Sequence, residues 1–430
     1  MKKQNALGAR VWFCAVFFGL VGQIAWIVEN MYFATFAQDI FSNSGRGDLS
    51  YLVTTLMVIF SALTATVTTI ISGALCDKVG KRKPFIAFGY IAWGITIMIF
   101  SAISMSVSAS NIVLVATLLV VFDCLMTIAG SASNDAAFNA WVADNTKPEN
   151  RGRLNSVLSI LPVIAVVIVF VGLGGFYNSQ AESNATFFII LGIIPIISGL
   201  IALLTLKDSN SIEKQSQLSA SDLFYGFRPS VVKENKMLYI CLLASCIIGI
   251  SQQTFFSYLI NFLSITLGLG GGFVIPMAVI IVMSAVMTAV AGIISDKIGR
   301  KKLYFPMLIL AISGILSLWA IQFTQGFLRT FITYFGGTIM MAGILSLGGF
   351  LSSTFQDKIP NGFQGRYQGV RMCFTVLIPM VVGPIISLII GLDAMGMNGD
   401  NFAPPYAIFL AAAIVAVLAI WPLAKIRREK

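Results

Sequence analysis

Two acidic residues lie deep within long apolar runs of this sequence, and they are the side chains best placed to do chemistry. Glu29 falls in the first run and Asp123 in the fourth, with Asp135 toward the end of the fourth. If these runs cross a bilayer, each charge costs at least about 2.5–3.5 kcal/mol, so such residues usually serve a function. Because the chain has no His, a bound proton would need a carboxylate. We therefore predict that Glu29, Asp123 and Asp135 bind a cation, H⁺ or Na⁺.

A polar stripe follows the fourth apolar run. Asp123, Thr127, Ser131, Asp135 and Asn139 succeed one another at four-residue spacing, which places them on one face of a helix. Such a stripe does not face lipid, so it either lines an aqueous cavity or packs against a polar helix. We expect it to line a cavity, with Asp123 and Thr127 in contact with a ligand. The alternative is a buried acid, neutral or paired, that holds two helices together.

Amide side chains and aromatic rings accompany the acids on the first and seventh runs. Gln23, Trp26 and Asn30 share a helical face in the first run, beside Glu29. An aromatic ring next to amides suits a sugar, whose C–H faces stack on the ring while its hydroxyls form hydrogen bonds. Packing between helices is the alternative for this set. The candidate substrate-binding residues are Gln23, Trp26, Asn30, Asp123, Thr127, Gln252, Gln253 and Asn261.

The composition requires these residues to be positioned by membrane-spanning helices. Of 430 residues, 57% are hydrophobic and 11% charged, whereas a soluble protein has about 25% charged residues. A soluble multidomain enzyme is therefore excluded. A helical span needs about 20 mostly apolar residues, and the alternation of a barrel strand is absent. We predict an all-α integral membrane protein with twelve transmembrane helices, near residues 11–36, 51–76, 85–107, 111–138, 156–177, 186–206, 238–264, 273–294, 303–324, 328–354, 369–392 and 404–424.

The basic residues are consistent with this number of spans. With both termini in the cytoplasm, all but three of the 28 Lys and Arg residues fall in cytoplasmic segments. The exceptions are Arg46 and Arg329 on the other side and Arg371 inside a span. Positive charge retains loops in the cytoplasm, so the net charge of +10 sets orientation and does not indicate nucleic-acid binding. We expect a multi-pass protein of the plasma (bacterial inner) membrane.

An internal repeat divides the chain into two copies of six spans. The loop after the second span reads GALCDKVGKRKPF, and the loop after the eighth reads GIISDKIGRKKLYF. The aligned pairs are Gly73 with Gly292, Asp77 with Asp296 and Gly80 with Gly299. The predicted domains are an N-terminal half, 1–206, a polar cytoplasmic linker, 207–236, and a C-terminal half, 237–430.

This repeated loop resembles the signature loop of the major facilitator superfamily, and the resemblance extends over the whole chain. It implies two six-helix pseudo-symmetric halves, with a substrate site at the midplane between them, and secondary active transport by alternating access. In that setting Glu29, Asp123 and Asp135 would be the ion-coupling residues. The resemblance and the repeat together also suggest a cytoplasmic gate, in which Arg371 pairs with Asp77 and Arg153 with Asp296. The gate residues are Asp77, Arg82, Arg153, Asp296, Arg300 and Arg371.

A second stretch resembles a narrower group of carriers. NDAAFNAWVADNTKPENRGR, residues 134–153, is similar to the loop between spans 4 and 5 of glycoside–pentoside–hexuronide symporters and related sucrose-type carriers. This resemblance implies that the transported solute is a sugar or glycoside and that a cation moves with it. The acidic residues usual on the second span of those carriers are absent from 51–76, which leaves H⁺ as the predicted coupling ion.

Two other functions are open at this point. A multispecific exporter of amphiphilic compounds would use the 17 Met and 33 Phe residues, although the polar stripe argues against it. A transport-dead membrane sensor would have the same sequence features. An enzyme is not expected, because there is no His and no Cys or metal constellation. We expect no cofactor beyond the coupling cation, a small-molecule substrate, a lipid bilayer as surroundings, and a functional monomer.

Overall fold

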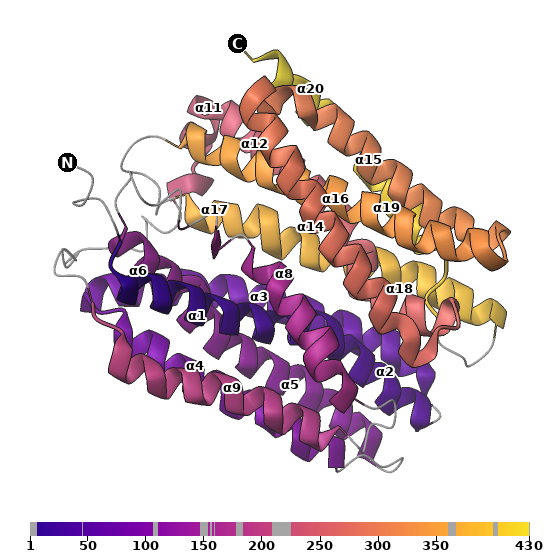
Figure 1. The fold of residues 1–430 in the computed structure, drawn as a ribbon, viewed down its shortest axis with the longest axis horizontal. Coiled ribbons are helices and arrows are strands. Elements are labelled where there is room, and N and C mark those ends of the chain that lie inside the picture. Colours follow the sequence, from indigo (N-terminus) through magenta and orange to yellow (C-terminus); the bar gives the residue numbers. More distant parts are fainter. Residues whose placement is uncertain are drawn as a thin grey trace. The chain divides into compact units, whose positions relative to one another are not determined.

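The computed structural model of this chain describes residues 7–44, 46–105, 111–146, 154, 157–158, 160–177, 184–208, 225–359, 367–398 and 403–429. Every regular element in these ranges is a helix (Figure 1). The predicted all-α membrane fold is confirmed. The chain forms two compact units, Met1–Ser219 and Ala220–Lys430.

The first unit contains the first six apolar runs. Its helices are α1 (Ala9–Ile27), η1 (Val28–Tyr32), α2 (Phe33–Asn43), α3 (Gly47–Val79), α4 (Lys83–Met105), α5 (Ile112–Gly130), η3 (Ser131–Phe138), α6 (Asn139–Asp144), α8 (Leu161–Val167), η4 (Ile168–Leu173), η5 (Gly174–Phe176) and α9 (Ala185–Thr205).

The second unit contains the other six runs. Its helices are η7 (Tyr225–Phe227), α11 (Pro229–Glu234), α12 (Lys236–Phe256), α13 (Leu259–Asn261), η8 (Phe262–Thr266), η9 (Gly270–Phe273), α14 (Val274–Ile298), α15 (Arg300–Ala320), η10 (Ile321–Phe323), α16 (Gly326–Lys358), α17 (Gln368–Met372), η11 (Cys373–Leu377), α18 (Ile378–Asn398), α19 (Ala407–Val417) and α20 (Ile420–Arg428).

Eleven helical segments of the described residues are long and apolar enough to cross a membrane, and each coincides with a predicted span. The predicted span 156–177 corresponds to a shorter apolar helix, Leu161–Phe176, because part of its first turns lies outside the described residues. The first segment continues to Ser42 and so includes Asp39, beyond the predicted end at 36. Helices extend beyond their apolar stretch because the backbone hydrogen bonds continue through polar residues.

Some of these spans contain π-helical turns, which recur in the two units. η1 and η8 lie in the first and seventh spans, and η4 and η11 in the fifth and eleventh. A π-helical turn inserts one residue into the α-helical register and is often found at functional sites. In the fourth span η3 is also π-helical, whereas α16, at the equivalent place in the second unit, is one continuous α-helix. The fourth span, which carries Asp135, therefore has a local geometry of its own.

Glycines allow α4 and α9 to pack with their backbones in contact (Figure 1). A Cβ added at Gly94 would lie 2.3 Å from the carbonyl oxygen of Gly192. A Cβ at Gly192 would lie 2.6 Å from the carbonyl oxygen of Gly94, and one at Gly199 would lie 2.5 Å from that of Ala87. Small residues at such crossings are typical of membrane helices, where close packing replaces the hydrophobic effect as the driving force.

Replacing Gly94 by Ala should therefore destabilise the first unit by about 1–3 kcal/mol, the usual cost of overpacking. The matched control is Gly73→Ala on α3, where an added Cβ meets nothing within 4 Å. Thermal unfolding of the purified proteins in one detergent measures both. Equal melting temperatures for the two variants would contradict the backbone contact.

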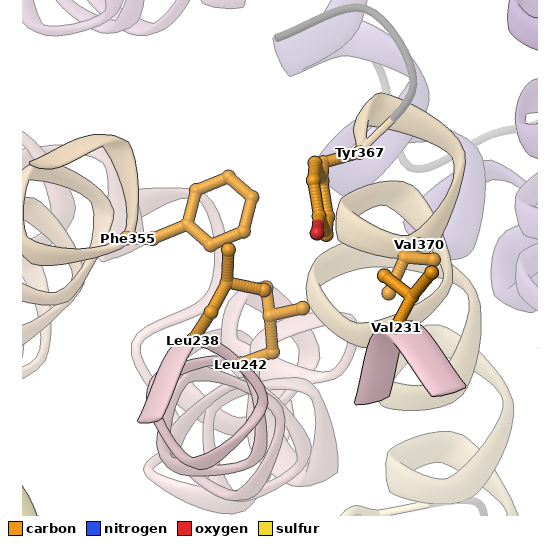
Figure 2. Packing of buried hydrophobic residues seen from close by; sticks show 6 residues of the cluster. All are labelled: Val231, Leu238, Leu242, Phe355, Tyr367 and Val370. Carbon is orange, nitrogen blue, oxygen red and sulfur yellow. The ribbon is translucent and has the colours of Figure 1, made fainter. Parts of the chain in front are cut away.

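A hydrophobic cluster fixes the ends of several helices in the second unit (Figure 2). It consists of Val231, Leu238, Leu242, Phe355, Tyr367 and Val370. These residues come from α11, α12, α16 and the start of α17. Figure 2 shows the ring of Phe355 pointing toward Leu238, and Val231 beside Val370. Buried packing of this kind holds the turn that leads into α17 against α12 and α16.

Candidate functional site

Glu29 lies on the π-helical turn η1, and its carboxylate joins three helices of the first unit. The Oε1 atom of Glu29 accepts a hydrogen bond of 2.6 Å from Ser61 Oγ on α3. Thr127 Oγ1 on α5 lies 2.9 Å from the same atom and 3.0 Å from Ser61 Oγ. Thr127 has one hydroxyl proton, which it donates either to Glu29 or to the carbonyl of Asp123, also at 2.9 Å. Three apolar helices thus meet at one carboxylate oxygen.

Asp123 is the second buried acid of this cluster. It lies one turn before Thr127 on α5 and is 2% exposed. Thr127 links the two acids, since its Oγ1 atom lies 2.9 Å from Glu29 Oε1 and 2.9 Å from the carbonyl oxygen of Asp123. Oε2 of Glu29 and Oδ1 of Asp123 are buried and make no hydrogen bond to any residue that the structure describes. Within the described part of the chain, neither carboxylate forms an ion pair with Lys or Arg.

This arrangement determines what the cluster can do. A buried carboxylate without a positive partner is costly as an anion, so its charge must be balanced by a bound proton or cation. Ser61 stabilises the ionised form of Glu29 by donating a hydrogen bond to it, and Thr127 does so when its proton is directed to Glu29. The cluster therefore has the chemistry to hold a proton or another cation.

The polar stripe is only partly buried. Thr127 and Ser131 are fully buried, Asp135 is half-buried and Asn139 is exposed. Ser131 Oγ donates to Asp135 Oδ2 at 3.0 Å, and Asn139 Nδ2 donates to the Asp135 carbonyl at 3.0 Å. The Asp123 end of the stripe is therefore buried inside the first unit, and the Asn139 end lies at the surface of that unit.

The face of α1 that was predicted to bind a sugar has mixed contacts. The ring centroids of Trp26 and of Trp93 on α4 lie 5.0 Å apart. Among the described residues, the buried Nε1 atom of Trp93 has no hydrogen-bond partner. Asn30 Nδ2 donates to the Trp26 carbonyl at 2.7 Å, within its own helix. Gln23 is half-buried. Trp93 is fully buried and Trp26 is half-buried, so only Trp26 is open to contact a solute, and the amide of Asn30 is bonded within its own helix.

Sequence reasoning missed two hydrogen-bonded groups of the first unit. Asn134 Nδ2 donates to Tyr90 Oη at 2.7 Å, and Tyr90 Oη donates to the carbonyl of Phe18 at 2.7 Å, so η3, α4 and α1 are tied together. Tyr177 Oη donates to Asp39 Oδ2 at 2.7 Å. In the sequence, the signal that could have identified Tyr90 is its own hydroxyl group within an apolar run. Asp39 was missed because the predicted span ended before it.

The three predicted amides of the second unit separate into different environments. Gln252 lines a cavity of about 280 Å³ that also contains Arg371. Gln253 packs where α12 crosses α18, since a Cβ added at Gly383 would lie 2.7 Å from Gln253 Cβ. Asn261 is 2% exposed, and its Oδ1 atom has no hydrogen-bond partner. Of these amides, Gln252 has the surroundings of a ligand-binding residue.

Two of the predicted gate arginines are paired within their own units. Arg82 Nε lies 3.0 Å from Asp144 Oδ2, with side-chain exposures of 6% and 25%. Arg300 Nη2 lies 2.6 Å from Asp357 Oδ2, with exposures of 34% and 62%. In each unit, therefore, an arginine of the repeated loop binds an acid near the end of another span. Arg153 lies outside the described residues, as do the side chains of Asp77 and Asp296, so the pairs of the gate stay predictions.

Comparison with known proteins identifies the family. The sequence matches the Major Facilitator Superfamily over residues 11–384. This chain belongs to the Major Facilitator Superfamily. The match covers most of the chain, and the resemblance predicted from the repeated loops is confirmed at this level. The chain is therefore a multi-pass membrane transporter, with a small-molecule substrate.

Solved transporter structures share the fold of the whole chain. A mutant of the nucleoside transporter NupG has a TM-score of 0.72 at 12% identity, covering 97% of this chain and 99% of that one. A D-xylose–proton symporter has a TM-score of 0.72 at 15% identity, with 97% of each chain covered. A bacterial homologue of the human lysosomal transporter Spinster has a TM-score of 0.69 at 15% identity, covering 97% and 96%. No curated protein sequence matches this chain.

Proposed function

We propose that this member of the superfamily is a secondary active transporter that moves a small polar solute, a sugar or glycoside, by alternating access in symport with protons. The observation that carries the proposal is the carboxylate of Glu29, whose Oε2 atom is buried and whose Oε1 atom lies within hydrogen-bond distance of Ser61 and Thr127, with Asp123 one turn before Thr127 on α5. A proton taken up by this pair removes the cost of a buried negative charge. Protonation of these acids is therefore coupled to the conformational change of alternating access.

The polar solute is supported by the side chains of both units. Trp26, half-buried and packed on Trp93, is the aromatic candidate of the first unit, and Gln252 lies in the wall of a cavity in the second. The nucleoside transporter and the D-xylose–proton symporter that share this fold are named for hydroxylated solutes. We also place both termini in the cytoplasm and the protein in a plasma (bacterial inner) membrane, on the charge asymmetry of the loops.

Uptake into proteoliposomes tests this function. Vesicles containing the purified chain are loaded at neutral pH and diluted into a panel of radiolabelled sugars, glycosides, nucleosides and peptides, with imposed H⁺ or Na⁺ gradients applied separately. We expect saturable uptake of at least one hydroxylated solute, raised by an inward proton gradient and unchanged by a sodium gradient. Protein-free vesicles are the control. Uptake driven by sodium alone would overturn the coupling ion, and uptake of no solute would favour a sensor.

A further inference from the structure

Four exposed cations of the second unit lie where α15 begins and α20 ends. We call them the basic patch, which consists of Lys302, Lys425, Arg427 and Arg428. The two helices are in contact (Figure 1). Lys301 Nζ donates to the carbonyl oxygen of Glu429 at 2.7 Å. The guanidinium carbon of Arg427 lies 5.5 Å from the centroid of the Phe305 ring. Because Lys302 and Phe305 are three residues apart, they share a face of α15, and Lys302 therefore lies on the side of Arg427.

The basic patch has no acidic partner among the described residues. Two acids of the same helix ends are paired with other residues. Asp357 lies 2.6 Å from Arg300, and Glu429 accepts from Lys358 and lies 3.8 Å from Lys301. None of the four cations of the patch forms an ion pair within the described part of the chain. The patch therefore keeps a positive charge that the described residues do not compensate.

The equivalent place in the first unit has a different charge balance. There the chain after the sixth span brings Asp208 to the start of α4, where Oδ1 accepts from the backbone amides of Arg82 and Lys83 at 2.7 and 2.8 Å. In the second unit the end of the twelfth span brings the three cations of α20 to the start of α15. Orientation in a membrane depends on how many basic residues a loop has, and does not require them to meet. The convergence of the basic patch therefore favours an anionic ligand.

Exposed apolar side chains continue from the basic patch along the twelfth span. Trp421 on α20 is 54% exposed, and Lys425 Nζ lies 4.2 Å from the centroid of its ring. Leu418 and Ile414 are also exposed. They precede Trp421 by three and seven residues, so the three side chains share one face of the span. Tryptophan is enriched where spans meet the headgroups of a bilayer. A ligand of this surface thus meets cations at one end and apolar side chains beyond them.

We propose that the basic patch binds an anionic phospholipid, with the phosphate held by Lys302 and Arg427 and the acyl chains along Trp421 and the exposed apolar face of the twelfth span. The charges are complementary, because Arg binds phosphate through paired hydrogen bonds and Lys binds it as a point charge. Clusters of Lys and Arg next to the end of a span are typical sites for anionic lipids. A soluble anion would leave the apolar face without a contact. The inference goes beyond solute transport and needs neither a substrate nor a coupling ion.

Native mass spectrometry of the full-length chain in detergent measures this binding. The purified protein is titrated with anionic phosphatidylglycerol and, separately, with zwitterionic phosphatidylcholine that has the same acyl chains. Each cation near an anionic lipid changes the affinity about fivefold. With two cations on one phosphate, we expect the first phosphatidylglycerol to bind about twentyfold more tightly than the first phosphatidylcholine. Equal affinities for the two lipids overturn the proposal.

Variants that remove charge locate the lipid on the protein. Lys302→Gln combined with Arg427→Gln should lower the affinity for phosphatidylglycerol about twentyfold and leave that for phosphatidylcholine unchanged. The matched control combines Lys81→Gln with Lys233→Gln, which removes two exposed cations outside the basic patch, and it should keep the preference for phosphatidylglycerol. Binding of phosphatidylcholine shows that each variant is folded. If the two double variants lose the preference equally, or if neither loses it, the basic patch is not the site.

Thermal unfolding in the same detergent separates a lipid from a soluble phosphate. Phosphatidylglycerol should raise the melting temperature of the unaltered chain but not that of the Lys302→Gln, Arg427→Gln protein, because a ligand stabilises only the state that binds it. Glycerol 3-phosphate carries the phosphate without acyl chains, so the same concentration of it should leave the melting temperature unchanged. An equal rise with glycerol 3-phosphate would assign the basic patch to a soluble phosphate and overturn the lipid.

Discussion

Proton-driven accumulation of solute should disappear in the Glu29→Gln and Asp123→Asn proteins. A difference of one pH unit is worth about 1.4 kcal/mol, so symport of one proton per solute supports about tenfold accumulation inside vesicles. Neither variant can bind and release a proton at its altered site. We therefore expect the accumulation ratio to fall to about one, whatever the imposed gradient.

The two substitutions keep the shape and the hydrogen bonds of the site. The amide oxygen of Gln at position 29 still accepts from Ser61 and Thr127, so the variant should fold and exchange labelled for unlabelled solute at equilibrium. Exchange without accumulation would be the signature of lost coupling. A loss of both would indicate structural damage.

The matched control for Glu29→Gln is Glu234→Gln, which alters an exposed residue of α11 outside the apolar spans. It should accumulate solute as the unaltered protein does. If the Glu29→Gln and Asp123→Asn proteins both retain their dependence on the pH gradient, the assignment of these acids to coupling is wrong. If only one of the two variants retains this dependence, the proton is assigned to the residue that is altered in the other variant.

Removal of Arg82 should cause the largest loss of stability among the charged residues. Its guanidinium pairs with Asp144 at 3.0 Å and is 6% exposed, and its backbone amide donates to Asp208 Oδ1 at 2.7 Å. Breaking this pair costs about 1–3 kcal/mol, because Asp144, whose side chain is only 25% exposed, is left without this partner. Arg82→Ala should lower the free energy of unfolding by this amount, whereas the contact of the backbone amide survives.

Arg300→Ala is the matched control, because it removes an arginine from an exposed ion pair. Arg300 and Asp357 lie 2.6 Å apart, but solvent reaches both side chains, so the expected cost is about 0–1 kcal/mol. Denaturant-induced unfolding of both variants in the same lipid–detergent mixture measures the difference. Adding Asp144→Asn to Arg82→Ala should recover part of the lost stability, since it removes the unpaired charge. Similar losses at Arg82 and Arg300 would contradict the role of burial.

Much of the fold could be predicted from the sequence because a lipid bilayer imposes simple requirements on a chain. Each span must be about 20 apolar residues long and must satisfy its own backbone hydrogen bonds, so apolar runs become helices. The repeated GxxxDKxG loops identified two copies and, through them, the superfamily. The cost of charge in lipid singled out Glu29 and Asp123, because both interrupt long apolar runs.

The sequence could not predict which side chains meet, because spacing fixes the face of a residue only relative to its own helix. Apart from the polar stripe of the fourth span, most of these helices are apolar on nearly every face, so the sequence contains little that sets their rotation against their neighbours. Backbone contacts at glycines such as Gly94 set that rotation. π-helical turns then shift the register of the residues after them.

Particular residues show this division. That Glu29 is a buried acid follows from the sequence, but its partner Ser61 comes from a helix whose serines and threonines look alike in the sequence. Gln252 and Gln253 are adjacent amides, yet the folded chain places one in a cavity and the other in a helix crossing. Local composition was enough to determine the number of helices, their repeat and the acids that lipid makes costly. The contacts of each acid and amide were decided by tertiary packing, because they depend on how each helix is rotated in its bundle.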